Sequence, residues 1–267
     1  MKTSFNNKSA CRPFFPFISG FFLYFSSVAC LAAYASPTNC AIAQYDFLST
    51  YHEFSSTPND KHLKRNIVAS NMALSECIKM ISASLTPDIV NQLSNAQKGM
   101  QAELSFNINS LEKTGTTPGQ PVANMVNYAL ETTKILERQI DSKSTTSSSL
   151  RKQAVMMAYI KSRYLERAYS MGGDLFRETS AERSIEDLVV DFSKKLDVLR
   201  KDKALTSNAA LYKNINTAYV RFNFLKKSIM DYNTSAVPFV VKYHSTFIIK
   251  TLLDIADELD KQSAKAA

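Results

Sequence analysis

The chain has 267 residues, 45% of them hydrophobic, and a formal net charge of +8. This hydrophobic content is enough to bury a core, and the length allows one domain or two, which argues against a disordered chain. The positive charge is not gathered into blocks of Lys and Arg with interleaved aromatic residues. The pattern therefore argues against a nucleic-acid partner.

Residues 1–35 are predicted to be a signal peptide. Lys2, Lys8 and Arg12 form a basic start, and residues 14–33 are almost continuously apolar. Ala33-Tyr34-Ala35 then supplies the small-x-small pattern that signal peptidase accepts, which places cleavage after Ala35. Because an apolar run of about 20 residues also suffices for a membrane span, a retained anchor is the alternative.

Cleavage changes both the expected charge and the expected compartment. Residues 1–35 hold three cations and no acid, so their removal lowers the net charge from +8 to +5. The mature protein is then only mildly basic and carries no membrane span. We expect it to be periplasmic or secreted.

Two cysteines, Cys40 and Cys77, remain after cleavage. In an oxidising compartment a lone pair usually forms a disulfide. A bridge here closes a loop of 37 residue steps and is expected to stabilise the fold by about 3 to 4 kcal/mol on the chain-entropy model. Two buried free thiols are the alternative, since the spacing fits no metal or redox motif.

Helical patterns fill the first half of the mature chain. Thr86-Pro87-Asp88 is a strong start signal, because it combines a cap, a proline at the first helical position and an acid in the first turn. The most loop-like stretch covers residues 116–121. We predict helices over Cys40–Phe54, Lys61–Leu85, Pro87–Lys113 and Pro121–Ser142.

Four amphipathic helices are predicted in the second half. One runs from Ser148 to Met171 and ends at Gly172-Gly173, and the next begins near Ser180. The third follows residues 206–208, with apolar positions that alternate in 4-3 steps, and the fourth follows residues 233–235. Helices with short links bury such stripes only against one another, which predicts an antiparallel four-helix bundle.

The predicted fold is all-α, with two antiparallel four-helix bundle modules in tandem after the signal peptide. The modules are placed at residues 36–143 and 150–260, and residues 261–267 form a tail. Between the modules lies a Ser/Thr-rich junction at residues 144–149, whose hydroxyls compete with helix hydrogen bonds. This junction is either a linker or a weak spot in one long shared helix.

Motifs for catalysis are missing from the sequence. It contains no phosphate-binding Gly-rich loop, no HExxH and no nucleophile elbow. His52 and His62 lack a zinc-site spacing and are predicted to be exposed, whereas His244 is predicted to be a hydrogen-bonded core or interface residue. We expect no enzyme activity, no metal and no cofactor.

The segment SLRKQAVMMA at residues 149–158 carries a resemblance to known proteins, as does the run at residues 237–243. Both are similar to helix starts in the periplasmic four-helix sensor module of type IV pilus methyl-accepting chemoreceptors and nitrate/nitrite sensor kinases. Arg151 stands where those families have their first arginine, and Met156 replaces the second. The resemblance covers residues 147–260 and implies a sensor in which arginines of two subunits hold an anion at a dimer axis.

The residue pattern predicts that Arg151 and Gln153 are ligand-binding residues. They flank the seam formed by Leu150, Ala154 and Met157, half exposed in a monomer and facing a partner in a homodimer. A guanidinium there is suited to hold a small anion or carboxylate with two hydrogen bonds. Solvation or an intrahelical salt bridge is the alternative for Arg151.

The predicted function follows from these features. We expect an exported, non-enzymatic, sensor-like protein that binds a small ligand, such as an anion, or a partner protein in signalling or pilus-related sensing. The alternative is a structural or adaptor protein whose helix faces dock an envelope protein and which has no ligand pocket.

Overall fold

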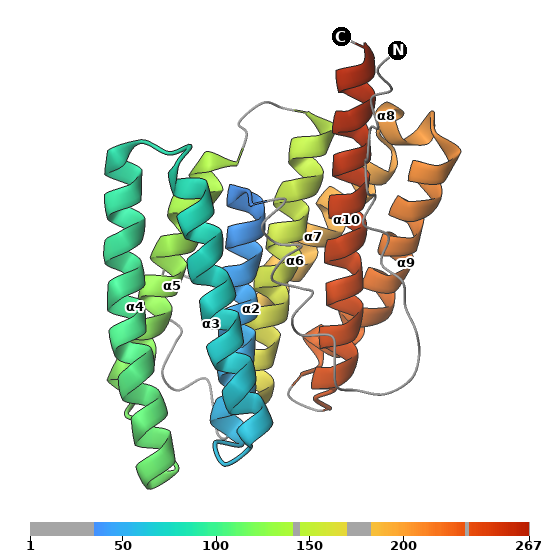
Figure 1. The fold of residues 1–267 in the computed structure, drawn as a ribbon. Helices are drawn as coiled ribbons and strands as arrows, with labels where there is room; N and C mark the ends of the chain where they lie inside the picture. Colours follow the sequence, from blue (N-terminus) through green and yellow to red (C-terminus); the bar gives the residue numbers. More distant parts are fainter. Residues whose placement is uncertain (1–34, 141–144, 170–182, 233–234, 267) are drawn as a thin grey trace, which may run out of the picture.

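A computed structural model describes residues 35–140, 145–169, 183–232 and 235–266. Over these residues the protein is helical and contains no strand (Figure 1), so the all-α prediction is confirmed for this part of the chain. None of the described helices is both long enough and apolar enough to cross a membrane. The predicted signal peptide lies outside the described residues except for Ala35. The helices are α2 (Pro37–Ser56), α3 (Lys61–Ser82), α4 (Pro87–Thr114), α5 (Gly119–Gln139), α6 (Thr146–Tyr169), α7 (Ile185–Arg200), α8 (Lys203–Thr206), α9 (Ala209–Met230) and α10 (Pro238–Ala266).

Polar caps and special backbone residues set the helix limits. Ser36 Oγ accepts a hydrogen bond of 3.2 Å from an amide in the first turn of α2, and Asn208 Oδ1 does the same for two amides of α9. Helix α4 begins at Pro87, as predicted. Its C-terminal cap is Gly115, whose φ of 72° lies in the left-handed region that glycine adopts without strain.

The described part of the predicted junction is not an exposed linker. Helix α6 begins at Thr146, and its first residues Ser147 and Ser148 are buried. Thr146 Oγ1 donates a hydrogen bond of 2.8 Å to Asp202 Oδ2, just before α8. The Ser/Thr-rich segment therefore begins a packed helix, and its small hydroxyl side chains allow close approach to neighbouring helices.

Other limits of the second half differ from the prediction. The predicted helix end at Gly172-Gly173 and the predicted cap Ser180 lie outside the described residues, and α7 begins at Ile185 with Ser184 as its cap. The short helix α8 was not predicted. Residues 261–266, which were predicted to be a tail, continue α10.

Helices α2 and α6 lie side by side in the middle of the molecule (Figure 1). Helix α2 also packs against α3 and α5, and α4 packs against α5. Helix α6 also packs against α7 and α10, and α9 contacts both of these helices. One contiguous cluster of buried apolar residues runs through both halves, so the halves share a core along the α2–α6 seam.

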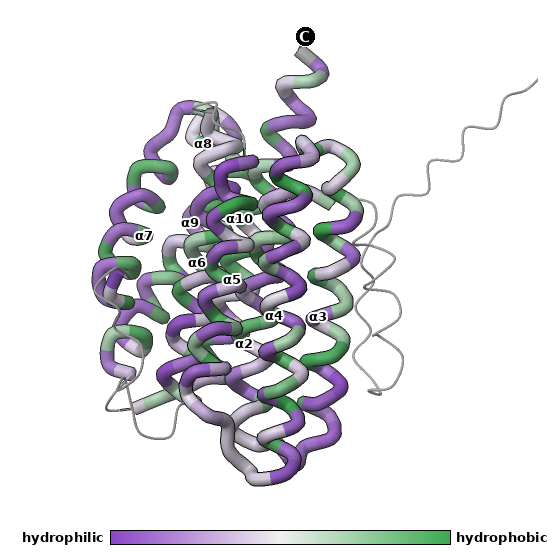
Figure 2. The backbone as a smooth tube through the Cα atoms, turned by 90° about the vertical axis from the view of Figure 1, so that its left-hand side faces the viewer, coloured by the Kyte–Doolittle hydropathy of each residue, from purple (hydrophilic) through white to green (hydrophobic). Residues whose placement is uncertain are grey.

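Amphipathic stripes account for the packing of the outer helices. Hydrophobic and hydrophilic segments alternate along them in Figure 2, as expected when one face is buried. Phe222 of α9 packs on Phe192 of α7 with 4.5 Å between ring centroids. Six of the seven predicted 4-3 positions are buried in α9, namely Leu211, Ile215, Ala218, Phe222, Leu225 and Ile229. The seventh, Tyr232, lies beyond the end of the helix and is half-buried.

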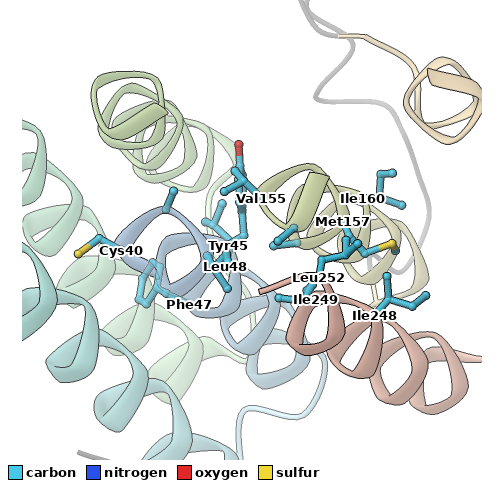
Figure 3. Packing of buried hydrophobic residues seen from close by; sticks show 14 of the residues in the cluster. Cys40, Tyr45, Phe47, Leu48, Val155, Met157, Ile160, Ile248, Ile249 and Leu252 are labelled. Carbon is cyan, nitrogen blue, oxygen red and sulfur yellow. The ribbon is translucent and has the colours of Figure 1, made fainter. Parts of the chain in front are cut away.

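Aromatic, aliphatic and charged contacts hold the α2–α6 seam together. Tyr45 of α2 lies near Val155 of α6 in Figure 3, and its ring stacks on Tyr159 at 5.0 Å between centroids. Lys161 of α6, only 4% exposed, forms an ion pair with Asp46 of α2. The seam thus combines apolar contacts with the buried cation of Lys161.

Cys40 of α2 and Cys77 of α3 form a disulfide, as predicted from the sequence. Their Cα atoms are 5.5 Å apart, and both residues are buried. Figure 3 shows Cys40 on the side of α2 that points away from α6. The bridge therefore ties α3 to the central helix.

Candidate functional site

Arg151 faces α10, where its guanidinium binds two carboxylates. Nη2 donates to Asp257 Oδ1 at 2.7 Å and to Asp260 Oδ2 at 2.8 Å. Nη1 is buried and has no hydrogen-bond partner among the described residues. This interhelical pairing takes the place of the solvation or intrahelical salt bridge considered as an alternative from the sequence. An anion shared by two Arg151 side chains would have to compete with Asp257 and Asp260.

Replacement of Arg151 by alanine is expected to lower the free energy of unfolding by only about 1 kcal/mol, because exposed ion pairs are screened by water. The two carboxylate side chains are 50% and 54% exposed. Urea unfolding followed by circular dichroism measures the change, which should shrink further in about 1 M salt. A loss above about 3 kcal/mol would contradict this account and match a buried pair instead.

Gln153 lies on another side of α6, because two positions along a helix correspond to a rotation of about 200°. The residue is 5% exposed, and its side-chain Oε1 is buried without a hydrogen-bond partner among the described residues. The structure thus does not bring Arg151 and Gln153 into one site. A buried amide oxygen without a donor costs about 1 to 3 kcal/mol, which a ligand donor would offset.

Gln153 lines a groove of about 450 Å³ that follows the α2–α6 seam between α5 and α7. Its floor is aromatic and aliphatic, and its polar side chains are mostly cationic. The apolar lining consists of Tyr45, Leu130, Ile140, Val155, Met156, Tyr159 and Leu188. The polar lining consists of Lys134, Glu137, Lys152, Gln153, Arg183 and Lys195.

The cations of the groove differ in how they are neutralised. Lys195 and Arg183 each donate a hydrogen bond of 3.0 Å to Asp191. These bonds hold the pKa of Asp191 below its usual value. Lys152 is exposed and forms no ion pair within the described part of the chain. The groove therefore keeps positive charge at the α6 side of its rim.

Glu137 is the single acid among the described residues that line the groove. The residue is exposed, but desolvation by the surrounding protein still raises the pKa of the carboxyl group, while Lys134 one turn earlier lowers it by a smaller amount. Glu137 therefore takes up a proton at higher pH than an ordinary glutamate. As the pH falls through this range, the groove becomes more positive.

The histidines are not gathered into a site. His52 is buried in α2 at 6% exposure, which corrects the prediction that it is exposed and follows from the packing of α2 against α3, α5 and α6. His62 is exposed at the start of α3, and His244 Nδ1 lies 3.2 Å from Arg221 Nη1. Within the described ranges, no three His, Cys, Asp or Glu residues are placed to hold a metal ion.

Comparison of the chain with protein-family models, with curated proteins and with solved structures finds no match. The resemblance of residues 147–260 to pilus and nitrate sensor modules stays a prediction. Sequence reasoning found Gln153 but missed the groove around it. The other residues that line the groove come from α2, α5 and α7. No local sequence motif predicts that α2 packs on α6.

Proposed function

We propose that this protein is an exported, non-enzymatic, sensor-like binding protein whose ligand is an amphipathic anion held in the groove over the α2–α6 seam. The observation that carries the proposal is the composition of the groove. Aromatic and aliphatic side chains line it together with Lys134 of α5, Lys152 of α6 and Lys195 of α7. Such a site fits a carboxylate or sulfonate attached to an apolar body.

The floor supplies the apolar part of recognition. The stacked rings of Tyr45 and Tyr159 adjoin the aliphatic side chain of Val155. The volume of about 450 Å³ falls in the range of about 300 to 1,000 Å³ typical of small-molecule sites. Burial of a ligand's hydrocarbon part there gains about 25 cal/mol per Å² of apolar surface removed from water.

The polar residues supply charge and orientation. Lys152 is exposed and forms no ion pair with a carboxylate of the described residues, so its ammonium group is free to bind a ligand anion. Gln153 Oε1, which has no hydrogen-bond partner among the described residues, can accept a hydrogen bond from an N–H or O–H group of the ligand. Met156, which stands where the sensor families have a second arginine, lines the same groove, and this favours a ligand with an apolar part over a small inorganic anion.

The helix packing suits a sensor role. We infer that α2 to α5 form one four-helix module and that α6, α7, α9 and α10 form the other. The groove is lined from both, because Tyr45 and Lys134 come from the first and Gln153 and Lys195 from the second. A ligand between two modules changes their relative stability or position, and a partner in signalling or pilus-related sensing would detect that change.

The fluorescent probe 1-anilinonaphthalene-8-sulfonate tests the proposal, because it joins an aromatic body to a sulfonate. We expect saturable binding that decanoate displaces more strongly than decanol. Lys152→Glu and Gln153→Leu should each weaken binding by about tenfold, the equivalent of 1.4 kcal/mol. Binding should strengthen as the pH falls and Glu137 takes up its proton, and Glu137→Gln should remove that dependence.

Two matched variants separate the groove from other surfaces. Lys98 of α4 is exposed and does not line the groove, so Lys98→Glu should leave probe binding unchanged. Phe239→Ser removes the most exposed aromatic ring of α10 and should also leave it unchanged. Unaltered binding in both groove variants would refute the ligand site and favour the adaptor function, in which the helix faces dock an envelope protein.

A further inference from the structure

A continuous aromatic strip crosses α9 and α10, which lie side by side (Figure 1). It consists of Phe224 of α9 and of Phe239, Tyr243 and His244 of α10. Ring centroids are 6.4 Å apart for Phe239 and Tyr243, 5.1 Å for Tyr243 and His244, and 5.2 Å for His244 and Phe224. Phe239 is 78% exposed, Phe224 61% and Tyr243 56%. None of these residues lines the groove.

The strip is separate from the core of the protein. In α9, Val220 and Phe224 lie one turn apart on a stripe with Lys213 and Lys227, on the side opposite the buried stripe that ends at Ile229. Val220 is 65% exposed and extends the apolar surface of the strip. A contiguous exposed patch of large apolar side chains indicates an interaction surface.

The charge around the strip is mainly positive. Residues 203–253 contain seven Lys and Arg and a single acid, Asp231. Two of these cations are neutralised by acids outside that range, because Lys242 pairs with Glu53 and Lys250 with Asp254. Lys213 and Lys227 are exposed and form no ion pair with other described residues. The Arg221 guanidinium lies 3.6 Å from the centroid of the Phe247 ring, beside the strip. The partner of this face is therefore expected to be anionic and able to take up exposed rings.

We propose that the aromatic strip, together with Lys213 and Lys227, rests on the surface of an anionic lipid bilayer. Aromatic side chains sit favourably at the level of the lipid headgroups, and lysines beside them are attracted to anionic lipids. The centres of protein interfaces, by contrast, are poor in lysine. Nucleic-acid surfaces require a denser row of phosphate-binding cations than these two exposed lysines. The pair α9 and α10 thus forms a peripheral membrane-binding face.

Tryptophan fluorescence of the full chain tests the orientation residue by residue, because the chain has no native tryptophan. Phe239→Trp should shift its emission to the blue and be quenched by brominated lipids on vesicles of equal parts phosphatidylglycerol and phosphatidylcholine. Phe106→Trp is the matched control, since Phe106 is a 51% exposed phenylalanine of α4. It should show neither effect, which also separates this face from any binding by the N-terminal segment.

Charge variants test the electrostatic part. Neutralisation by Lys213→Gln and Lys227→Gln together should weaken partitioning of the Phe239→Trp protein to the same vesicles by about 25-fold, or about fivefold for each lysine. Lys98→Gln with Lys113→Gln, both on α4, is the matched control and should change nothing. Circular dichroism melts check that each variant keeps its fold, which surface substitutions should preserve.

Three results would overturn the proposal. Equal quenching of the tryptophans at positions 239 and 106 would show that the strip has no preferred contact with lipid. Equal binding to vesicles of pure phosphatidylcholine would remove the anionic partner. A blue shift produced by single-stranded DNA without lipid, or by an increase in protein concentration alone, would assign the face to nucleic acid or to a second copy of the chain.

Discussion

Replacement of both Cys40 and Cys77 by alanine is expected to lower the free energy of unfolding by about 3 to 4 kcal/mol, on the chain-entropy account of disulfides. The bridge spans 37 positions of sequence, so its removal gives the unfolded chain the freedom of a loop of that length. Both cysteines are buried between α2 and α3. The loss is a large part of the 5 to 15 kcal/mol that typically separates folded from unfolded domains.

Urea unfolding monitored by circular dichroism measures this loss, and reduction separates its causes. Wild-type protein kept in a reducing agent should unfold at about the same urea concentration as the alanine variant, because both lack the bridge. A variant much less stable than reduced wild type would indicate that the lost sulfur atoms leave cavities. A variant as stable as the oxidised protein would contradict the disulfide.

Elements with a clear stripe or a strong start signal were predictable. Helix α9 shows its 4-3 pattern because only one face is buried, and Asn208 caps it as its side chain suggests. The start of α4 at Pro87 is dictated by local chemistry. The disulfide was predictable because the predicted signal cleavage would leave only Cys40 and Cys77 to pair.

The central helices were harder to interpret, because they are buried around most of their circumference. Helix α6 buries Lys161, Ser162 and Arg163 in consecutive positions, and charged residues at such positions usually indicate a solvated face. Helix α2 likewise buries Gln44 and His52. A helix surrounded by others lacks the one-sided pattern on which prediction depends. The contact between α2 and α6 therefore could not be predicted from the sequence.

The candidate site was likewise predictable only in part. The sequence singled out Gln153, and the structure places it in the groove. Arg151, only two positions away, turns to α10 and binds Asp257 and Asp260. These acids lie more than 100 residues further along the chain. Arg151 meets them only because α6 packs on α10, which the sequence pattern around Arg151 does not predict. Lys134 and Glu137 reach the groove because α5 packs on α2.

Asp46→Ala is expected to destabilise the fold by about 2 to 3 kcal/mol, because it leaves the ammonium group of Lys161 without its carboxylate partner. Lys161 is 4% exposed in the α2–α6 seam. The Asp46 side chain is 48% exposed, so water partly replaces it, and the effect falls below the 3 to 5 kcal/mol typical of a fully buried pair. Urea unfolding gives the value.

Lys161→Met shows whether the charge or the packing causes this loss. Methionine keeps the apolar stem in the seam and removes the charge, so its effect should stay within about 1.5 kcal/mol. The double variant Asp46→Ala with Lys161→Met should therefore recover most of the loss caused by Asp46→Ala alone. Asp254→Ala breaks the exposed pair with Lys250 and should cost at most about 0.5 kcal/mol. If Asp46→Ala costs no more than this control, Lys161 is solvated, and the α2–α6 seam that forms the groove is open.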